Sequence, residues 1–399
     1  MFKTLNISSK LVLSVAISVI IAIVILISIV SSQVTSYAEK GAKDTIFISS
    51  KRYANYIEGI LNESVVLTKG MSTSINEMFS KHDQVSTDLI ESLLKNTFDS
   101  SGYAAYTFLY LKDPSVLSDT YAIDKKYRSQ DGNTFAMIFF DETTGKAGGI
   151  KTIQTPNDFS QLHIIQDIEK NSRYEDKDAL FVSSPTRLNY DGEEFLGVNF
   201  GVPIFSNKGK FIGVMGYTVD LLEISQDLID PKLDFFEGEL RLLTTDNEII
   251  TLHNNKNAIL KTLSDINKDP SVKLLINAIK DHKNALVDNY IASTGDLSYA
   301  SVVSFSTLGD SSHWSMIVTA PKKSVLEPLY KLQFIIIVVA IIALIVILFI
   351  VYFCVRKIVG IRIPVILKSL EDFFRFLNHE KIEVHTIKIS SNDELGKMA

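Results

Sequence analysis

The sequence contains one cysteine, one tryptophan and no proline before Pro114. A single cysteine, Cys354, cannot form a disulfide within the chain, so the folded part has to be held together by its hydrophobic core. The absence of early prolines permits a long uninterrupted helix in the N-terminal region. The single cysteine excludes a small disulfide-stapled scaffold. The length of the chain, 399 residues, indicates one large or two ordinary domains.

Clustered positive charge and catalytic motifs are missing as well. The net charge is −6 and no basic cluster accompanies it, which argues against nucleic-acid binding. No Gly-x-Gly-x-x-Gly or P-loop pattern occurs. His379 and His385 have no cysteine or third ligand at a convincing spacing for zinc. The sequence therefore predicts a protein that is not an enzyme and carries no cofactor.

Two long apolar runs without a charge, Leu11–Val30 and Phe334–Val355, are present instead. A helix of about 20 residues, at ~1.5 Å per residue, spans the ~30 Å hydrocarbon core of a bilayer. Lys10 precedes the first run, and Arg356 and Lys357 follow the second, so we expect both termini in the cytoplasm. The first run is longer than the apolar stretch of a signal peptide, which predicts an uncleaved anchor.

The hydropathy pattern divides the chain into consecutive parts. We expect a cytoplasmic N-terminus over 1–10, transmembrane helices over 11–32 and 334–355, an outer region over 33–330 and a cytoplasmic segment over 356–399. Within the outer region we expect a long helix over 33–82, a larger, membrane-distal lobe over 83–220 and a smaller, membrane-proximal lobe over 221–323. The expected fold class is α+β, with two α/β lobes outside the membrane.

An apolar stripe marks the predicted long helix. Its members are Ile46, Tyr53, Ile57, Ile60, Leu67, Met71 and Met78. Their gaps are combinations of threes and fours, which is the register of a helical seam. We expect half of the stripe to pack against the chain's own domain, and the membrane-proximal half to meet a second copy in a parallel homodimer.

After residue 100 the apolar period changes to two, which is typical of strands. The expected strands are Tyr103–Leu111, Phe135–Asp141, Gly149–Thr155, Glu194–Phe205 and Lys210–Val219 in the larger lobe, and Glu239–Thr244, Glu248–Thr251, Leu297–Phe305 and Trp314–Thr319 in the smaller lobe. Gly209 is expected to supply the positive φ of a hairpin turn. Short helices are expected over Asp220–Leu228 and Lys273–Lys280, and Pro321 is expected to start a helix that runs into the second apolar run.

Motifs in both lobes and after the second apolar run follow an informative order. Gly197–Phe205 and then Gly209–Gly216 read as an apolar strand, Pro-Ile, a turn and Gly-x-x-Gly; the smaller lobe has Leu242–His253 and His313–Pro321. Ile363-Pro364 opens an apolar-periodic helix, and Ser391–Gly396 follows it. Together these stretches resemble the double-Cache extracytoplasmic sensor of methyl-accepting chemotaxis receptors, with the last two resembling the start of a HAMP relay.

The resemblance implies two PAS-like (Cache) lobes after a long helix, two transmembrane helices and a partial HAMP helix. It implies a two-pass receptor of the bacterial inner membrane, with a periplasmic sensor, a homodimeric state and control of a chemotaxis kinase complex of the CheA/CheW type. The family's long signalling hairpin does not occur in the sequence. We therefore expect either a truncation or the sensory half of a split receptor that works with a separate signalling-domain polypeptide.

The resemblance also bears on the ligand. Amino-acid-binding members carry Arg-x-Trp-Tyr for the ligand carboxylate and two aspartates for its ammonium. Here the only tryptophan is Trp314, in the smaller lobe, and Thr218 and Ser184 stand at or near the positions of the aspartates. Hydroxyls alone compensate a buried ammonium poorly. We therefore expect a small organic acid without an amino group as the ligand.

A ligand carboxylate requires cationic or fork-shaped donors. His163 is the first candidate, because its segment Asp158–Ile168 takes the place of the Arg-x-Trp-Tyr region. The further candidates are Arg173 and Tyr174 on a loop, Lys151 on a short strand and the strand hydroxyls of Ser184 and Thr218. For each of them an ordinary surface or backbone-bonding role is the alternative. The smaller lobe, with fewer convergent polar groups, is expected to be a spacer.

Two other functions fit the same pattern. The chain could be the sensory input half of a histidine kinase or a nucleotide cyclase, whose outer sensor would look the same. It could also be a membrane-tethered binding protein without signalling. The apolar stripe within Val365–Leu377 argues mildly against a decayed receptor. The leading prediction is a dimeric transmembrane sensor for a small molecule.

Overall fold

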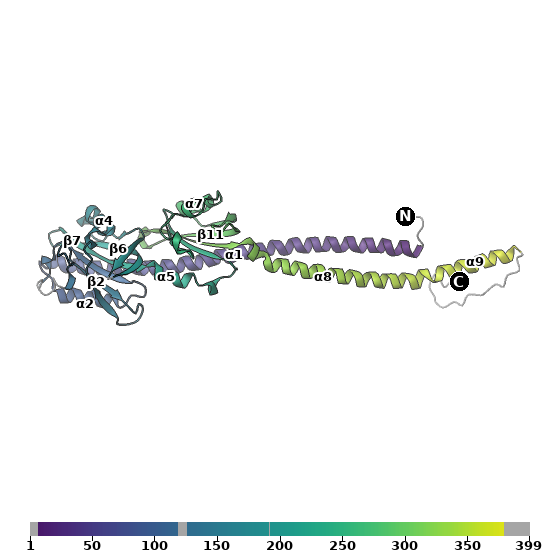
Figure 1. Ribbon diagram of the computed structural model, residues 1–399, viewed down its shortest axis with the longest axis horizontal. Coiled ribbons are helices and arrows are strands. Elements are labelled where there is room, and N and C mark those ends of the chain that lie inside the picture. The colour runs from purple at the N-terminus through teal and green to yellow at the C-terminus, as the bar shows by residue number, and fades with distance from the viewer. Residues whose placement is uncertain (1–6, 119–125, 191, 379–399) are drawn as a thin grey trace. The chain divides into compact units, whose positions relative to one another are not determined.

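The computed structural model describes residues 7–118, 126–190 and 192–378 (Figure 1). The chain forms two compact units. One is Gly41–Val325, which contains all strands in the described residues, and the other consists of the helical segments before and after it. The expected combination of a long N-terminal helix with antiparallel sheets is confirmed.

The elements follow one another along the chain in a simple order. The helices are α1 Ile7–Lys81, α2 Thr87–Phe98, α4 His163–Asn171, α5 Leu221–Leu228, α6 Leu263–Ile266, α7 Val272–Lys280, α8 Lys322–Val355 and α9 Arg362–Leu377. The strands of the larger lobe are β1 Tyr106–Leu111, β2 Ala136–Asp141, β3 Ile150–Ile153, β4 Phe181–Val182, β5 Thr186–Tyr190, β6 Glu193–Phe205 and β7 Phe211–Asp220. Those of the smaller lobe are β8 Leu240–Thr245, β9 Ile250–Leu252, β10 Ala285–Ile291, β11 Leu297–Ser306 and β12 His313–Pro321.

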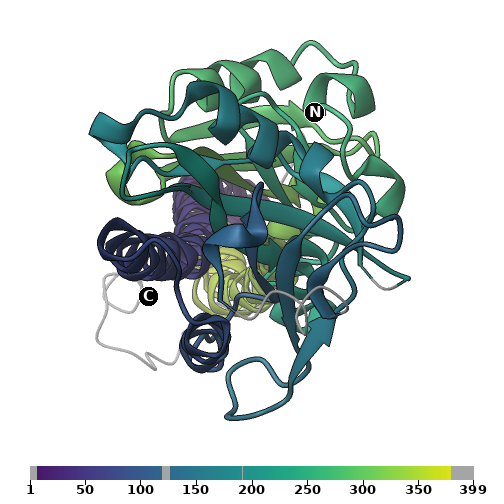
Figure 2. The same cartoon turned by 90° about the vertical axis from the view of Figure 1, so that its left-hand side faces the viewer.

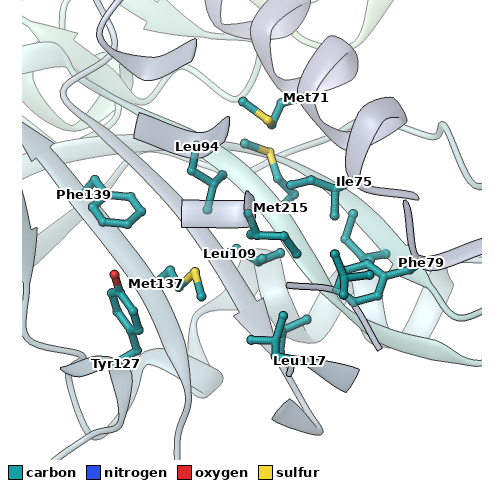
Figure 3. Close-up of a cluster of buried hydrophobic side chains, with 14 of the residues drawn as sticks. Met71, Ile75, Phe79, Leu94, Leu109, Leu117, Tyr127, Met137, Phe139 and Met215 are labelled. Atoms are coloured by element: carbon teal, nitrogen blue, oxygen red, sulfur yellow. The ribbon is translucent and has the colours of Figure 1, made fainter. Parts of the chain in front are cut away.

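The larger lobe is built on a seven-stranded antiparallel sheet in the order β3-β2-β1-β7-β6-β4, with β5 also paired to β6. Alternate residues of its strands face opposite sides. Leu109, Met137 and Met215 pack with Met71 and Ile75 of α1 and with Leu94 of α2, as Figure 3 shows. Helices α1 and α2 therefore cover one face of this sheet.

The opposite face of the same sheet is covered by α4 (Figure 2). Phe108, Ile138 and Val214 point to this side and pack with Ile164 and Ile168 of the helix. Since α4 is amphipathic and buries only its isoleucine face, its polar residues remain accessible. This arrangement positions the cavity described below.

The smaller lobe has a five-stranded antiparallel sheet in the order β10-β11-β12-β8-β9. Leu275 and Ile279 of α7 pack on one face against Val302 and Ile317. Helix α1 contributes to the lobe as well: Lys43 pairs with Asp288 of β10 at 2.7 Å and lies 5.4 Å from the ring centroid of Tyr299. The same helix therefore contacts both lobes.

The expected division of the apolar stripe on α1 is wrong. Ile46, Tyr53 and Ile57, in the half assigned to a second copy, are at most 2% exposed within this single chain. The chain's own folded unit covers them, because the smaller lobe packs along this part of the helix. An apolar stripe reports that a helix face is covered, and it does not report which chain covers it.

The hairpin β6–β7 forms as expected, with Gly209 at φ 72° in its turn. Asp220 caps α5 by accepting the N–H of Leu222 at 2.8 Å. Pro321 is the last residue of β12, and α8 begins at the next residue. This shifts the expected helix start by one position, because β12 continues pairing up to Pro321 opposite Ser298.

The second unit is helical in its described residues. The first part of α1 and α8 each contain a segment long and apolar enough to cross a membrane. Within this unit Gln333 donates to Ser31 Oγ at 2.8 Å and to Thr35 Oγ1 at 3.2 Å. The predicted helix after Ile363-Pro364 corresponds to α9, whereas Ser391–Gly396 lies outside the described residues.

Candidate ligand-binding site

A cavity of about 650 Å³ opens in the larger lobe between α4 and strands β4, β5 and β6. We call it the larger-lobe pocket. It is lined by Asp158, Gln161, Leu162, His163, Ile164, Asp167, Val182, Ser183, Ser184, Pro185, Thr186, Arg187, Leu188 and Asn199. A cavity of this size is within the range that holds small organic ligands.

Two backbone-directed hydrogen bonds shape the wall made by the β4–β5 connection. The Ser183 N–H donates to the Asn199 carbonyl at 2.9 Å, and the Asn199 N–H donates to Ser183 Oγ at 2.9 Å. The strands on either side of this connection both pair with β6: strand β4 pairs through Phe181–Val182, and strand β5 pairs through Thr186–Tyr190. The segment Ser183–Pro185 is therefore held against the middle of β6.

A buried amide lines the pocket, and a buried hydroxyl lies behind it. Asn199 is 2% exposed and Thr218 is fully buried on the adjacent strand β7. The Thr218 hydroxyl donates to Asn199 Oδ1 at 2.6 Å. The Asn199 Nδ2 group donates to no acceptor among the described residues, and Asn199 lines the cavity, so this group is available as a donor to a ligand.

The charged groups of the pocket lie at exposed positions. Arg187 on β5 alternates with the buried Leu188 and forms no ion pair with another described residue. Asp158 and Asp167 also line the pocket and are exposed. The site thus has a neutral polar interior and a rim that offers one guanidinium and two carboxylates.

Aromatic side chains support the wall next to α4. Tyr106 stacks on Phe195 at a centroid distance of 4.6 Å, and Phe159 packs against Tyr190 at 5.9 Å. Burial raises the pKa of Tyr106 to about 12, so its phenol is neutral at physiological pH. The cluster packs with Ile164 and Leu188, which line the pocket, and brings no charge to it.

The structure brings some of the predicted site residues together. His163, the first residue of α4, and Ser184 both line the larger-lobe pocket. Thr218 lies directly behind it, through its bond to Asn199. Their role in binding a ligand stays a prediction.

The other predicted residues do not line this pocket. Lys151 pairs with Glu142 beside it on the sheet edge. The Tyr174 ring packs against Phe205 at 5.6 Å and covers Gly209. Arg173 is exposed on the turn before Tyr174. All three residues are near the pocket segments in the sequence, but the fold places them outside the pocket lining.

Arg187 and Asn199 were missed by the sequence analysis. Arg187 follows Ser-Ser-Pro-Thr at the start of a short alternating strand, so an arginine beside two hydroxyls was a usable signal. Asn199 interrupts the apolar run Leu196–Ile204, where a buried amide needs partners. Its proximity to Ser183 depends on strand pairing, which the sequence does not specify.

A family model described as the first PDC sensor domain of methyl-accepting chemotaxis protein-like proteins matches residues 90–226. The solved periplasmic sensory domain of the Campylobacter jejuni chemoreceptor Tlp1 is 36% identical, with the match covering 73% of this chain and 99% of that one at a TM-score of 0.67. This chain belongs to the family of chemoreceptor periplasmic sensory domains.

More distant structures share the fold of this sensory domain. A structure titled methyl-accepting chemotaxis protein X is 15% identical over 71% of this chain and 98% of that one, with a TM-score of 0.55. The extracellular domain of the putative histidine kinase mmHK1S-Z2 is 16% identical over 71% and 99%, with a TM-score of 0.53. Comparison with curated proteins gives no match.

The chain therefore carries a sensory domain of the type found in chemoreceptors, and the extracellular domain of the putative histidine kinase shares its fold. The family model and the Tlp1 structure both describe sensory domains. The larger-lobe pocket falls within the part that the family model matches. These findings confirm the assignment to chemoreceptor sensors at the level of the sensory domain.

Proposed function

We propose that this protein is the sensory part of a transmembrane chemoreceptor that binds a small organic acid without an amino group in the larger-lobe pocket. The observation that carries the proposal is the placement of Arg187, which forms no ion pair with another described residue, at the rim of a cavity whose lining includes the neutral polar side chains of Asn199 and Ser183. An arginine offers a planar fork that matches a carboxylate. His163 lies in the same lining and supplies a second donor.

The interior favours a ligand without an ammonium group. Asn199 and Ser183 supply an amide and a hydroxyl group to the lining, and the carboxylates in the described lining, Asp158 and Asp167, are exposed. An ammonium placed beside the Asn199 amide would lose water without gaining an anionic partner. A hydroxyl or a second carboxylate of the ligand would instead accept from Asn199 Nδ2.

The size of the ligand limits its affinity. The most efficient small ligands gain about 1.5 kcal/mol per heavy atom. Acetate, with four heavy atoms, would then reach about 6 kcal/mol, which corresponds to tens of micromolar. A succinate-sized acid has room to bind more tightly in a cavity of about 650 Å³.

The remaining parts of the proposal concern the membrane and the output. The apolar segments of α1 and α8 would cross the bacterial inner membrane with the sensor in the periplasm, and α9 would belong to a HAMP relay. The relay would act on a chemotaxis signalling domain. In a homodimer, the outer face of α1, where Ile48 and Val66 are 64% and 57% exposed, would meet the second copy.

Titration of the full chain in lipid nanodiscs tests the proposal. The probes are acetate, lactate and succinate on one side, and serine and aspartate on the other. We expect at least one of the three organic acids to bind, and Arg187→Met to weaken its binding about tenfold or more, the order expected for one charge-assisted hydrogen bond. Arg173→Met is the matched control, since Arg173 is an exposed arginine of the same lobe outside the pocket.

Two results would contradict the proposal in different ways. Unchanged affinity of every probe in the Arg187→Met chain would remove the larger-lobe pocket as the carboxylate site. Binding of serine or aspartate, with no binding of the organic acids, would show that Asp158 and Asp167 compensate an ammonium. In that case the expectation of an amino-free ligand would be wrong.

A further inference from the structure

A second cavity of about 550 Å³ lies in the smaller lobe, far along the sequence from the first. We call it the smaller-lobe pocket. The segment after β9 contributes His253 and Asn255, the turn before α6 contributes Lys261, α6 contributes Asp265, and the β10–β11 connection contributes Ser293. From the sequence this lobe is expected to be a spacer. The proposed function places its ligand in the larger-lobe pocket and does not involve this second cavity.

The surroundings of His253 favour the neutral ring and select one of its two tautomers. It is 8% exposed, and its Nδ1 accepts the backbone N–H of Asn255 at 2.8 Å. An Nδ1 that accepts a hydrogen bond carries no proton, so the neutral ring has its proton on Nε2. Burial lowers the pKa of His253 and favours this neutral form.

The Nε2–H group of His253 is a buried donor without a partner among the described residues. Buried polar groups are normally paired, and an unpaired one is unfavourable by an amount comparable to a lost hydrogen bond. Because His253 lines the smaller-lobe pocket, a ligand oxygen in the cavity is the partner that would satisfy this group.

The charges around the cavity favour an anion. Lys261 lines it and forms no ion pair with another described residue. Asp265 also lines it, but its carboxylate already accepts from the Thr262 hydroxyl at 2.8 Å and lies 3.5 Å from Lys268 Nζ. The uncompensated charge at the cavity is therefore the ammonium of Lys261.

We propose that the smaller-lobe pocket is a second binding site, which takes a small carboxylate. One oxygen of the carboxylate accepts from His253 Nε2, and Lys261 provides the opposite charge. The His253 Nε2–H group and the Lys261 ammonium have no other partner in the described part of the chain. The site is independent of the larger-lobe pocket, so either site can be correct without the other.

The test uses the full chain in nanodiscs with Arg187→Met introduced, so that binding in the larger lobe does not mask the second site. Acetate, lactate and succinate are titrated into this chain and into the same chain with Lys261→Met or His253→Asn. The asparagine Oδ1 can take the place of Nδ1 as the acceptor for Asn255, and the side chain is too short to replace Nε2. Lys273→Met is the matched control, since Lys273 is an exposed lysine of the same lobe outside the lining.

We expect at least one of the three carboxylates to bind the Arg187→Met chain. We expect Lys261→Met and His253→Asn each to weaken that binding about tenfold, the loss typical of one hydrogen bond to a charged group, with Lys273→Met unchanged. Since Lys261 is exposed, its variant also serves if the histidine variant does not fold. The proposal fails if no carboxylate binds, or if Lys261→Met behaves like Lys273→Met.

Discussion

Arg241 joins more elements of the folded unit than its place on one strand suggests. It lies on β8, is 2% exposed, and donates to the carbonyl of Leu228 at 2.8 Å and to Asp234 Oδ1 at 2.6 Å. Its Nε and Nη2 atoms lie 3.1 and 3.0 Å from Glu239 Oε1. Its guanidinium lies 4.9 Å from the Tyr53 ring of α1. One side chain thus links the end of α5, the connection into the smaller lobe and the long helix.

Replacing Arg241 with Met should destabilise the protein strongly. The Glu239 side chain is 1% exposed, and the replacement leaves its carboxylate buried with only the Phe235 N–H as a donor. Breaking a buried ion pair by removing one partner costs about 3–5 kcal/mol. At roughly 2–4 °C per kcal/mol in a large domain, the melting temperature should fall by about 6–20 °C.

The measurement is thermal unfolding of the full chain followed by tryptophan emission. Trp314 is the only tryptophan, it is 2% exposed, and it lies on β12 of the smaller lobe, so it reports on the lobe that Arg241 anchors. The double variant Arg241→Met with Glu239→Met should recover much of the loss, since no charge is then left buried. A fall of less than about 3 °C, or a double variant no more stable than the single one, would refute this reasoning.

The same experiment has a pH dependence of known sign. Burial raises the pKa of Glu239, and the charge of Arg241 opposes that rise. In the Arg241→Met chain the Phe235 N–H is the donor that still opposes this rise among the described residues, so the folded state binds a proton more readily than the unfolded state. The deficit relative to the wild type should therefore be largest above neutral pH and should shrink as the pH falls toward 5.

Two further predictions concern local packing and a buried histidine. A Cβ at Gly216 would lie 2.4 Å from the Phe200 carbonyl oxygen, so Gly216→Ala should lower the free energy of unfolding by about 1–3 kcal/mol or more. A Cβ at Gly59, on the helix α1, would have nothing within 4 Å, so Gly59→Ala should raise the free energy of unfolding by about 0.5–1 kcal/mol. Melting curves by circular dichroism would show shifts in opposite directions. Burial lowers the pKa of His253, so above about pH 6.5 this histidine does not reduce the free energy of unfolding. As the pH falls below that value, the free energy of unfolding should decrease by at most about 1.4 kcal/mol per pH unit. The difference between the wild type and His253→Asn, followed between pH 5 and 8, isolates this effect, and a difference independent of pH would contradict it.

The strands that the sequence predicts well include four that are rich in apolar and β-branched residues. β2, β7, β11 and β12 begin and end within two residues of their expected bounds. β10 was not predicted, because a bulge between Val287 and Tyr290 breaks the period of two on which the prediction depends. Helix α2 was also not predicted, although Ile90, Leu94 and Phe98 recur every four residues and gave a usable signal.

The site could be predicted only in part, for a related reason. His163 and Ser184 were found from their place in the chain, and both line the larger-lobe pocket. The contact of Ser183 with Asn199 depends on which strands pair and in which register, and period-two alternation does not encode that pairing. His253 in the smaller lobe was not a candidate, because its unpaired Nε2 follows from a local backbone contact that only coordinates show.

Strand β6 provides a physical link between the larger-lobe pocket and α1. Asn199, near its centre, lines the pocket, and near its end Pro203 and Phe205 bond to Asn76 of α1. The Asn76 Nδ2 group donates to the Pro203 carbonyl at 3.0 Å, and its Oδ1 accepts the Phe205 N–H at 2.9 Å. Asn76 is 3% exposed, so a shift of β6 that broke these bonds would leave buried polar groups unpaired. A ligand that favours one position of β6 would therefore also favour one position of α1, through the two hydrogen bonds of Asn76. The size of this effect is limited to the difference in the ligand's binding free energy between the two positions.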